Sequence, residues 1–171
     1  MLNGIGYAQI VTASGPPPAP RDADRLLDEA VATFYGAQLE HAHLMQHLAV
    51  GHDLNPVDLR ALQYLGAIDD DRTPKELGGY LEMGTGAVTA LLDRLTRQGL
   101  LARVRNPDDR RSVRIELTAD GFAVVGTLRA AYRRVLEQAV PLESVQLFTD
   151  FTDRMAAALR SAALPEADPE R

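Results

Sequence analysis

The fold is decided by residues 73–117, TPKELGGYLEMGTGAVTALLDRLTRQGLLARVRNPDDRRSVRIEL. Thr73 offers a hydroxyl at an N-cap, a proline follows at the first helical position, and Glu76 is placed to reach back to the N-cap amide. The residues Met83-Gly84-Thr85-Gly86 break this first helix, and apolar residues then recur at helical spacing until Gly99, which suits a left-handed C-cap. The pattern predicts two short helices joined by a tight turn.

Two helices joined in this way place the second helix across the major groove in many DNA-binding proteins. The same shape also occurs as a packing element in other proteins, so the helices alone leave both uses open. The residues that come after them favour DNA.

These next residues predict a β-hairpin. Residues 100–105 and 112–117 have the pattern of two strands, and a polar tip, Asn106-Pro107-Asp108-Asp109-Arg110-Arg111, lies between them. Arginine suits the narrow, electronegative minor groove, and a nearby aspartate can hold its guanidinium in one orientation. The alternative is a solvated loop whose charges pair with one another.

The motifs of this region follow one another in a recognisable order: Gly86-Ala87-Val88-Thr89, Leu92-Asp93-Arg94-Leu95, Gln98-Gly99-Leu100, Asp109-Arg110-Arg111 and Leu117-Thr118-Ala119-Asp120-Gly121. Together they resemble the MarR family of bacterial transcription regulators, and the wing tip is the most specific part of the resemblance. It implies a mainly α fold, a winged helix-turn-helix with a two-stranded β wing, flanked by N- and C-terminal dimerisation helices. It also implies a homodimer on a roughly palindromic operator in double-stranded DNA, and release or modulation by a small ligand.

The resemblance assigns DNA contacts to particular positions. Thr85 and Thr89 match residues that touch phosphate or base edges, Arg94 matches a backbone-contacting arginine, and Arg111 matches the wing arginine that Asp109 orients. The full set expected at the DNA is Thr85, Gly86, Ala87, Thr89, Arg94, Asp109, Arg110 and Arg111.

Two positions depart from the family pattern. Gly84 stands where a serine N-cap is usual, and Ala90 stands where a basic residue is common. The second helix therefore offers no Asn, Gln or Arg for bidentate base reading in its first turns. Specificity is expected to depend on thymine-methyl contacts from Ala87 or Thr89 and on groove shape read by Arg111.

Composition and charge agree with this assignment. The 171 residues are 46% hydrophobic and 25% charged, as expected for one compact unit. The formal net charge is -6, but residues 72–114 hold nine basic and five acidic side chains, a net +4 against -10 for the remainder. Positive charge is thus concentrated at the motif, where it favours docking of DNA on one face.

Several classes of protein are excluded or disfavoured. The chain has no cysteine, which excludes thiol redox sensing, disulfides and thiolate metal sites. No apolar run approaches membrane-spanning length and the start lacks a signal-peptide n-region, so a cytoplasmic location without membrane contact is expected. No phosphate loop, nucleophile elbow or paired carboxylates are found, so neither an enzyme nor a cofactor is expected.

The flanking segments complete the expected organisation. Residues 1–21 form a Pro-rich leader, residues 22–163 one domain, and residues 164–171 a polar tail. Within the domain, 55–118 is the winged helix-turn-helix, beginning with an Asn55 cap. Residues 22–51 and 119–163, the latter interrupted at Pro141, carry broad apolar stripes that suit a dimer interface.

The four histidines, His41, His43, His47 and His52, all lie in one short stretch. His43 and His47 share a helix face with Glu40, so a metal-responsive regulator is one alternative, although no metal site is assigned. Histidines facing solvent or an interface are the other interpretation. The resemblance implies an effector pocket for a small aromatic or amphipathic ligand, with Phe34, Tyr35, His43 and Tyr64 as candidate lining.

The sequence thus predicts a ligand-responsive, homodimeric repressor that binds DNA. A winged-helix protein-interaction module without DNA binding is the runner-up, because the recognition helix carries so few base-reading side chains.

Overall fold

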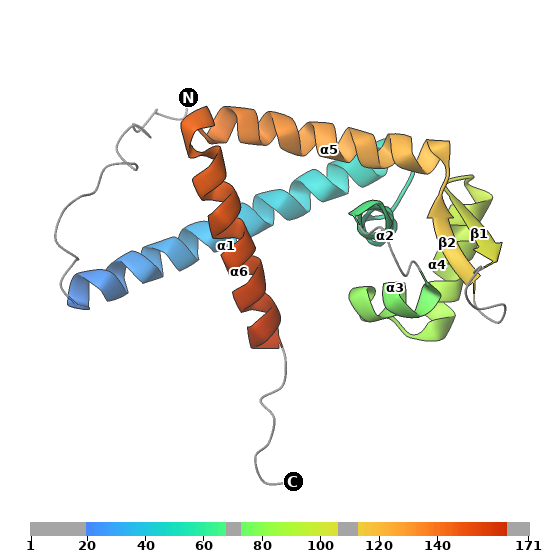
Figure 1. Ribbon diagram of the computed structural model, residues 1–171, viewed down its shortest axis with the longest axis horizontal. Helices are drawn as coiled ribbons and strands as arrows, with labels where there is room; N and C mark the ends of the chain where they lie inside the picture. Colours follow the sequence, from blue (N-terminus) through green and yellow to red (C-terminus); the bar gives the residue numbers. More distant parts are fainter. Residues whose placement is uncertain (1–19, 68–72, 106–112, 164–171) are drawn as a thin grey trace, which may run out of the picture. The chain divides into compact units, whose positions relative to one another are not determined.

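The computed structural model describes residues 20–67, 73–105 and 113–163, and these residues are mainly helical (Figure 1). The elements follow in the order α1 (Pro20–Gly51), α2 (Pro56–Ala67), α3 (Pro74–Leu81), α4 (Thr85–Arg97), β1 (Leu101–Arg105), β2 (Val113–Leu117), α5 (Ala119–Ala139), the 3₁₀ turn η2 (Leu142–Ser144) and α6 (Val145–Ala163). This order confirms the predicted winged helix-turn-helix between flanking helices.

The described residues fall into two compact units. One contains α1 to β2 and the first part of α5, as far as Ala131, and the other contains the rest of α5 with η2 and α6. The expected single domain over residues 22–163 and the leader and tail around it stay predictions, since residues 1–19 and 164–171 lie outside the described part.

Side-chain caps begin three of the helices, and those at Thr73 and Asn55 were predicted. The hydroxyl of Thr73 accepts a hydrogen bond from the backbone N–H of Glu76, 3.3 Å away, at the start of α3. The Asn55 side chain accepts from the N–H of Asp58 at 2.8 Å, and Thr118 accepts from the N–H of Gly121 at 3.1 Å. Each cap satisfies a backbone donor that the first turn of a helix leaves free.

The turn between α3 and α4 is tight because Glu82 adopts a left-handed conformation, with φ at 54°. Its N–H and that of Met83 then close onto the carbonyls of Gly79 and Gly78. Gly84 is the N-cap of α4 and gives no side-chain hydrogen bond. After α4, Gly99 takes a φ of 74°, as predicted for a left-handed C-cap.

The wing is a two-stranded antiparallel sheet in which Leu101 pairs with Leu117 and Arg105 with Val113. Ile115 and Leu117 are buried, while Val113 on the same face is 40% exposed because it lies beyond the core near the wing tip. The expected strand from residue 100 begins one residue later, and Ser112 lies outside the described residues.

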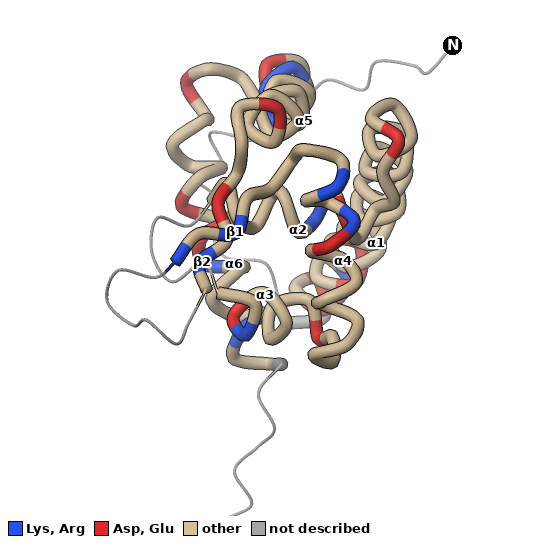
Figure 2. The backbone as a smooth tube through the Cα atoms, turned by 90° about the vertical axis from the view of Figure 1, so that its right-hand side faces the viewer, with Lys and Arg blue, Asp and Glu red and all other residues tan. Residues whose placement is uncertain are grey.

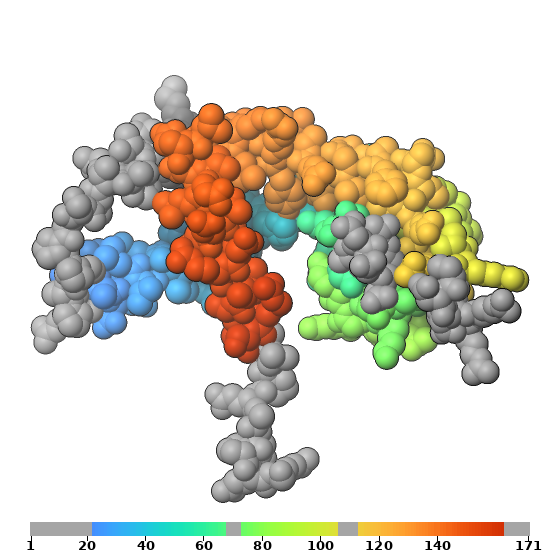
Figure 3. Space-filling model, viewed as in Figure 1, coloured from blue at the N-terminus to red at the C-terminus, as the bar shows by residue number. Residues whose placement is uncertain are grey.

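One core joins α2, α3, α4 and the wing, and these elements form a close-packed body in the space-filling view (Figure 3). Its fully buried large apolar side chains are Leu59, Leu62, Leu65, Leu77, Leu91, Leu92, Leu95 and Ile115. This core fixes α4 beside the wing.

The start of α5 is locked to this core. Thr118 donates its hydroxyl to the carbonyl of Gly99 at 2.6 Å, and its N–H bonds to the carbonyl of Leu100. A Cβ placed on Gly121 would overlap that Leu100 carbonyl oxygen. The glycine of the Leu117–Gly121 motif is therefore required by close backbone packing.

Candidate DNA-binding site

The N-terminal half of α4 presents small exposed side chains. Thr85, Gly86, Ala87 and Thr89 are all exposed, while Val88 between them is buried against the core. The division arises from helical spacing, since Val88, Leu91, Leu92 and Leu95 share the buried face. The structure thus places the four expected α4 contacts in the first turns of the helix, outside its buried face.

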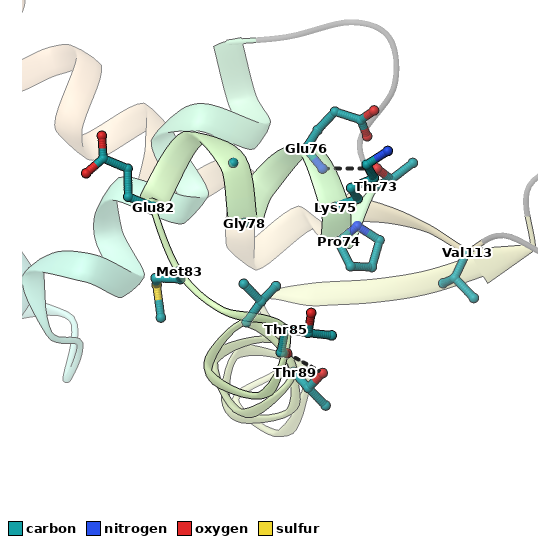
Figure 4. Close-up of a pocket in the computed structure, with 12 residues that line it drawn as sticks. Thr73, Pro74, Lys75, Glu76, Gly78, Glu82, Met83, Thr85, Thr89 and Val113 are labelled. Carbon is teal, nitrogen blue, oxygen red and sulfur yellow. Dashed lines mark hydrogen bonds between the residues drawn. The ribbon is translucent and has the colours of Figure 1, made fainter. Parts of the chain in front are cut away.

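The two threonines are linked to each other. The Thr89 hydroxyl donates to the carbonyl oxygen of Thr85 at 2.9 Å (Figure 4). This bond uses the only hydroxyl donor of Thr89 and leaves its oxygen free to accept. In this conformation Thr89 can accept from a base amino group or place its methyl against a thymine.

A hollow lies beside these threonines. It is an open cavity of about 830 Å³ between α3, the α3–α4 turn, the start of α4 and the wing (Figure 4). Its lining residues are Thr73, Pro74, Lys75, Glu76, Gly78, Gly79, Glu82, Met83, Thr85, Val88, Thr89 and Val113. The hollow therefore lies at the face where Thr85 and Thr89, two of the expected DNA contacts, are exposed.

Arg94 is held in place by Asp58, a residue whose position in the sequence gives no sign of a functional role. Its Nε and Nη2 donate to the two carboxylate oxygens of Asp58, at 2.9 and 2.5 Å. Asp58 is 1% exposed, whereas the Arg94 side chain is 38% exposed. The hydrogen bonds to Asp58 raise the pKa of Arg94 above its ordinary value, so its guanidinium stays charged.

The wing is tied to α4 by a second ion pair. Arg103 of β1 donates to Asp93 of α4 over 2.7 Å, and both side chains are partly exposed. The adjacent residues Asp93 and Arg94 therefore connect α4 in two directions, one to the wing and the other to α2. Figure 2 shows basic residues, in blue, along the wing strands β1 and β2.

The wing-tip residues Asp109, Arg110 and Arg111 lie outside the described residues, so their expected minor-groove contacts stay predictions. The described strands carry Arg103, Arg105 and Arg114. Positive charge therefore continues along the wing from the described strands to the tip given by the sequence.

The four residues expected at an effector pocket have different surroundings. Tyr64 stacks on Tyr80 with ring centroids 4.3 Å apart, Phe34 is half-buried, and Tyr35 and His43 are exposed. None of the four lines the cavity beside α4. A shared pocket for them stays a prediction.

The histidine stretch contains one close pair of possible metal ligands. His43 lies 3.6 Å from a carboxylate oxygen of Glu40, one helical turn away. Among residues 20–67, 73–105 and 113–163, no group of three or more His, Cys, Asp or Glu side chains is arranged to hold a metal ion. Within the same residues, no helix has the length and apolar character needed to cross a membrane.

Comparison with known proteins agrees with this geometry. The family model described as MarR family matches residues 52–112. The multiple antibiotic resistance protein MarR of Salmonella typhimurium is 39% identical over 79 residues, covering 42% of this chain and 52% of the relative. The transcriptional repressor YetL of Bacillus subtilis is 34% identical over 82 residues, covering 47% and 49%.

The winged helix-turn-helix of this chain, matched over residues 52–112, is therefore of the MarR-family type. The chain spans about half the length of these two relatives. The solved structure of Streptococcus pneumoniae FabT in complex with DNA has the same fold, with a TM-score of 0.61 at 20% identity, covering 81% of this chain and 98% of that one. The MarR-family fold therefore extends beyond the segment matched in sequence.

Proposed function

We propose that this protein is a sequence-specific DNA-binding transcriptional regulator. The observation that carries the proposal is the exposed first half of α4, with Thr85, Ala87 and Thr89 beside an arginine-bearing wing. An exposed second helix and a cationic hairpin are the two elements that a winged helix inserts into DNA grooves. The relative YetL is named as a transcriptional repressor, and the structure of FabT is that of a complex with DNA. Both support the same conclusion.

The proposed contacts divide by groove. The side chains of Thr85, Ala87 and Thr89 meet base edges and phosphates in the major groove, while Arg110 and Arg111 enter the minor groove with Asp109 as the orienting partner. Small side chains on α4 favour thymine methyl groups and groove shape over bidentate base reading. Sequence preference is then moderate at each position and depends on several weak contacts.

We propose further that the protein acts as a homodimer on a palindromic operator. Large apolar side chains along α1 are exposed in the single chain, among them Leu27 at 65%, Val31 at 50%, Tyr35 at 62% and Leu39 at 65%. Contiguous exposed apolar surface of this kind marks a protein interface. A second copy covers it and doubles the phosphate contacts on DNA.

The dimer is tested by Leu27→Glu with Leu39→Glu, measured by sedimentation equilibrium. We expect the mass of one chain, because charge on the apolar stripe opposes burial. The control is Ala37→Glu, which adds one negative charge on another side of α1 and should keep the dimer mass. A dimer mass for the double variant would contradict the assignment of α1 to the interface.

The regulatory part of the proposal is repression in the cytoplasm, relieved by a small aromatic or amphipathic ligand bound near Phe34, Tyr35, His43 and Tyr64. Titration of benzoate and naphthoate into a protein–DNA complex tests it by release of DNA. Phe34→Ala and His43→Ala should raise the concentration needed. If both variants release DNA at the same ligand concentration as the wild type, the ligand does not bind near these residues.

DNA binding is tested by fluorescence anisotropy with the chain's own upstream intergenic DNA, a scrambled duplex and a series of salt concentrations. We expect tighter binding to the first duplex, and log affinity that falls with log salt at a slope of about -0.9 per phosphate neutralised. Absence of binding even at low salt would favour the protein-interaction module over the regulator. The metal-responsive alternative predicts a zinc dependence that His43→Ala or His47→Ala abolishes.

A further inference from the structure

Asp58 is the only charged side chain that is buried among those that the structure describes. It lies in the first turn of α2, and its carboxylate accepts two hydrogen bonds from Arg94 of α4. The two residues are 36 positions apart in the chain. A single ion pair therefore joins the scaffold helix α2 to the helix proposed to read DNA.

Stability alone is a weak explanation for this pair. Removing a carboxylate from water is costly, and apolar residues of similar volume often serve as well or better at such sites. The geometry offers something that an apolar pair does not. A bidentate contact fixes both the position and the plane of the guanidinium.

The bidentate contact also leaves much of the guanidinium available. Arginine has five N–H donors, and the contact with Asp58 uses the Nε–H and one Nη2–H. Three donors, one on Nη2 and two on Nη1, remain on the outer edge for another acceptor. With 38% of its side chain exposed, Arg94 can present that edge to a ligand outside the protein.

The position of Arg94 on α4 points to a phosphate as that ligand. Arg94 lies in the last turn of α4, seven residues after the exposed Ala87. Seven residues make almost two full helical turns, so both lie on the same side of α4, about 10 Å apart. Where Ala87 meets base edges, Arg94 lies further along the helix, toward the DNA backbone that borders the groove.

We propose that Asp58 is a positioning residue for DNA binding, which holds the Arg94 guanidinium in the orientation that contacts a DNA phosphate. The inference rests on the proposed DNA-binding function. Arginine that is already oriented loses less conformational freedom on binding. Asp58 thus serves α4 in the way that the sequence predicts Asp109 to serve the wing.

The direction in which one substitution changes DNA affinity separates this role from simple electrostatics. Asp58→Asn removes a negative charge near DNA, so Coulomb attraction alone predicts tighter binding. Loss of positioning predicts the opposite, a weakening of roughly tenfold, which is the size expected when one charge-assisted hydrogen bond to DNA is removed. Glu116→Gln, which removes an exposed charge on β2, serves as the control and is expected to bind at least as tightly as wild type.

The experiment measures anisotropy on the upstream duplex and a scrambled duplex, with thermal melting of each variant to verify folding. A phosphate contact carries no sequence information, so Asp58→Asn should weaken binding to both duplexes by the same factor. The double variant Arg94→Met with Asp58→Asn removes both charges and should bind DNA no more weakly than Asp58→Asn alone. Compared with the wild type, its salt slope should be lower by about 0.9 for each phosphate that is no longer neutralised. A further weakening in that double variant would assign Asp58 to helix packing and overturn the proposal.

Arg94→Lys gives an independent test that keeps the charge and one hydrogen bond to Asp58. Lysine cannot be held at two points, so we expect it to bind DNA roughly tenfold more weakly than wild type. If Arg94→Lys or Asp58→Asn binds DNA as tightly as the wild type does, the positioning role is wrong. If the wild type itself fails to bind either duplex, the proposed function fails and not this inference.

Discussion

Helices α4 and α1 both carry an apolar stripe at helical spacing, yet the two stripes meet opposite environments. On α4, Leu91 and Leu95 are 1% and 0% exposed, whereas on α1, Leu27 and Leu39 are each 65% exposed. The sequence predicts a stripe equally well in both cases. The comparison teaches that periodicity identifies an apolar face without identifying the surface that covers it.

The reason lies in the elements that neighbour each helix along the chain. Short connections return α3, β1 and β2 to the sides of α4, so its stripe is covered within the same chain. Among the α1 side chains that the structure describes, residues 22–51, only those near the end of the helix, such as Met45 and Ala49, are buried. The long exposed part of α1 therefore needs a partner, which we propose to be a second copy.

The largest expected effect is the loss of a leucine from the covered stripe. Leu95→Ala should lower the free energy of unfolding by about 2–5 kcal/mol, because it leaves a cavity in a fully buried position. Urea denaturation measures this change. Thr96→Ala, at the exposed neighbouring position, should stay within about 0.5 kcal/mol of wild type. Similar losses for both variants would contradict the packing of α4.

A smaller effect is expected where α5 meets the wing. Gly121→Ala should cost about 1–3 kcal/mol, because the new methyl group meets the Leu100 carbonyl and forces the backbone to shift. Gly126→Ala in the same helix has open space around its Cβ and should stabilise by about 0.4–1 kcal/mol. Thermal unfolding of the two variants compares them directly. We predict that the two substitutions change the free energy of unfolding in opposite directions, and a change in the same direction would refute this.

The tie between α4 and the wing should contribute less to stability. Arg103→Ala breaks an ion pair between partly exposed groups and should cost about 0.2–1 kcal/mol. High salt should reduce this difference, since exposed charges are screened. Arg105→Ala, two residues further along β1, provides the comparison. A loss above that range that persists in high salt would show that the pair acts through packing.

The smallest effect on folding of the single chain is expected on the exposed stripe. Leu39→Ala should change the unfolding free energy by less than about 0.5 kcal/mol when the protein is dilute. The loss should grow toward about 1.5–3 kcal/mol with increasing protein concentration, because the proposed dimer would bury this leucine. Urea denaturation over a range of concentrations tests this. A loss as large as that of Leu95→Ala at every concentration would erase the difference between the two helices.

The caps and turns could be predicted from sequence because the interactions are local. Thr73, Asn55 and Thr118 each accept from an N–H three residues later, and Gly99 adopts the left-handed conformation expected at a C-cap. These interactions depend on residues within one helical turn. The left-handed conformation of Glu82 could not be predicted in this way, because the residue at that position is neither glycine nor asparagine.

The candidate site could be predicted only in part. The exposure of Thr85, Ala87 and Thr89 is implied by the apolar spacing of α4, since residues off the buried face must be exposed. The partner of Arg94 is not implied, because Asp58 has the local pattern of an ordinary first-turn acid that favours the N-terminus of α2. Nothing in a single sequence links two residues 36 positions apart.

By itself, the sequence determined the winged helix-turn-helix, its caps, its wing and the charge concentrated there, because each depends on neighbouring residues or on residue type. The tertiary structure decided which apolar stripe is covered, why Gly121 must be a glycine, and that Asp58 holds Arg94. These depend on distances between elements remote in the chain, which packing sets and local spacing does not.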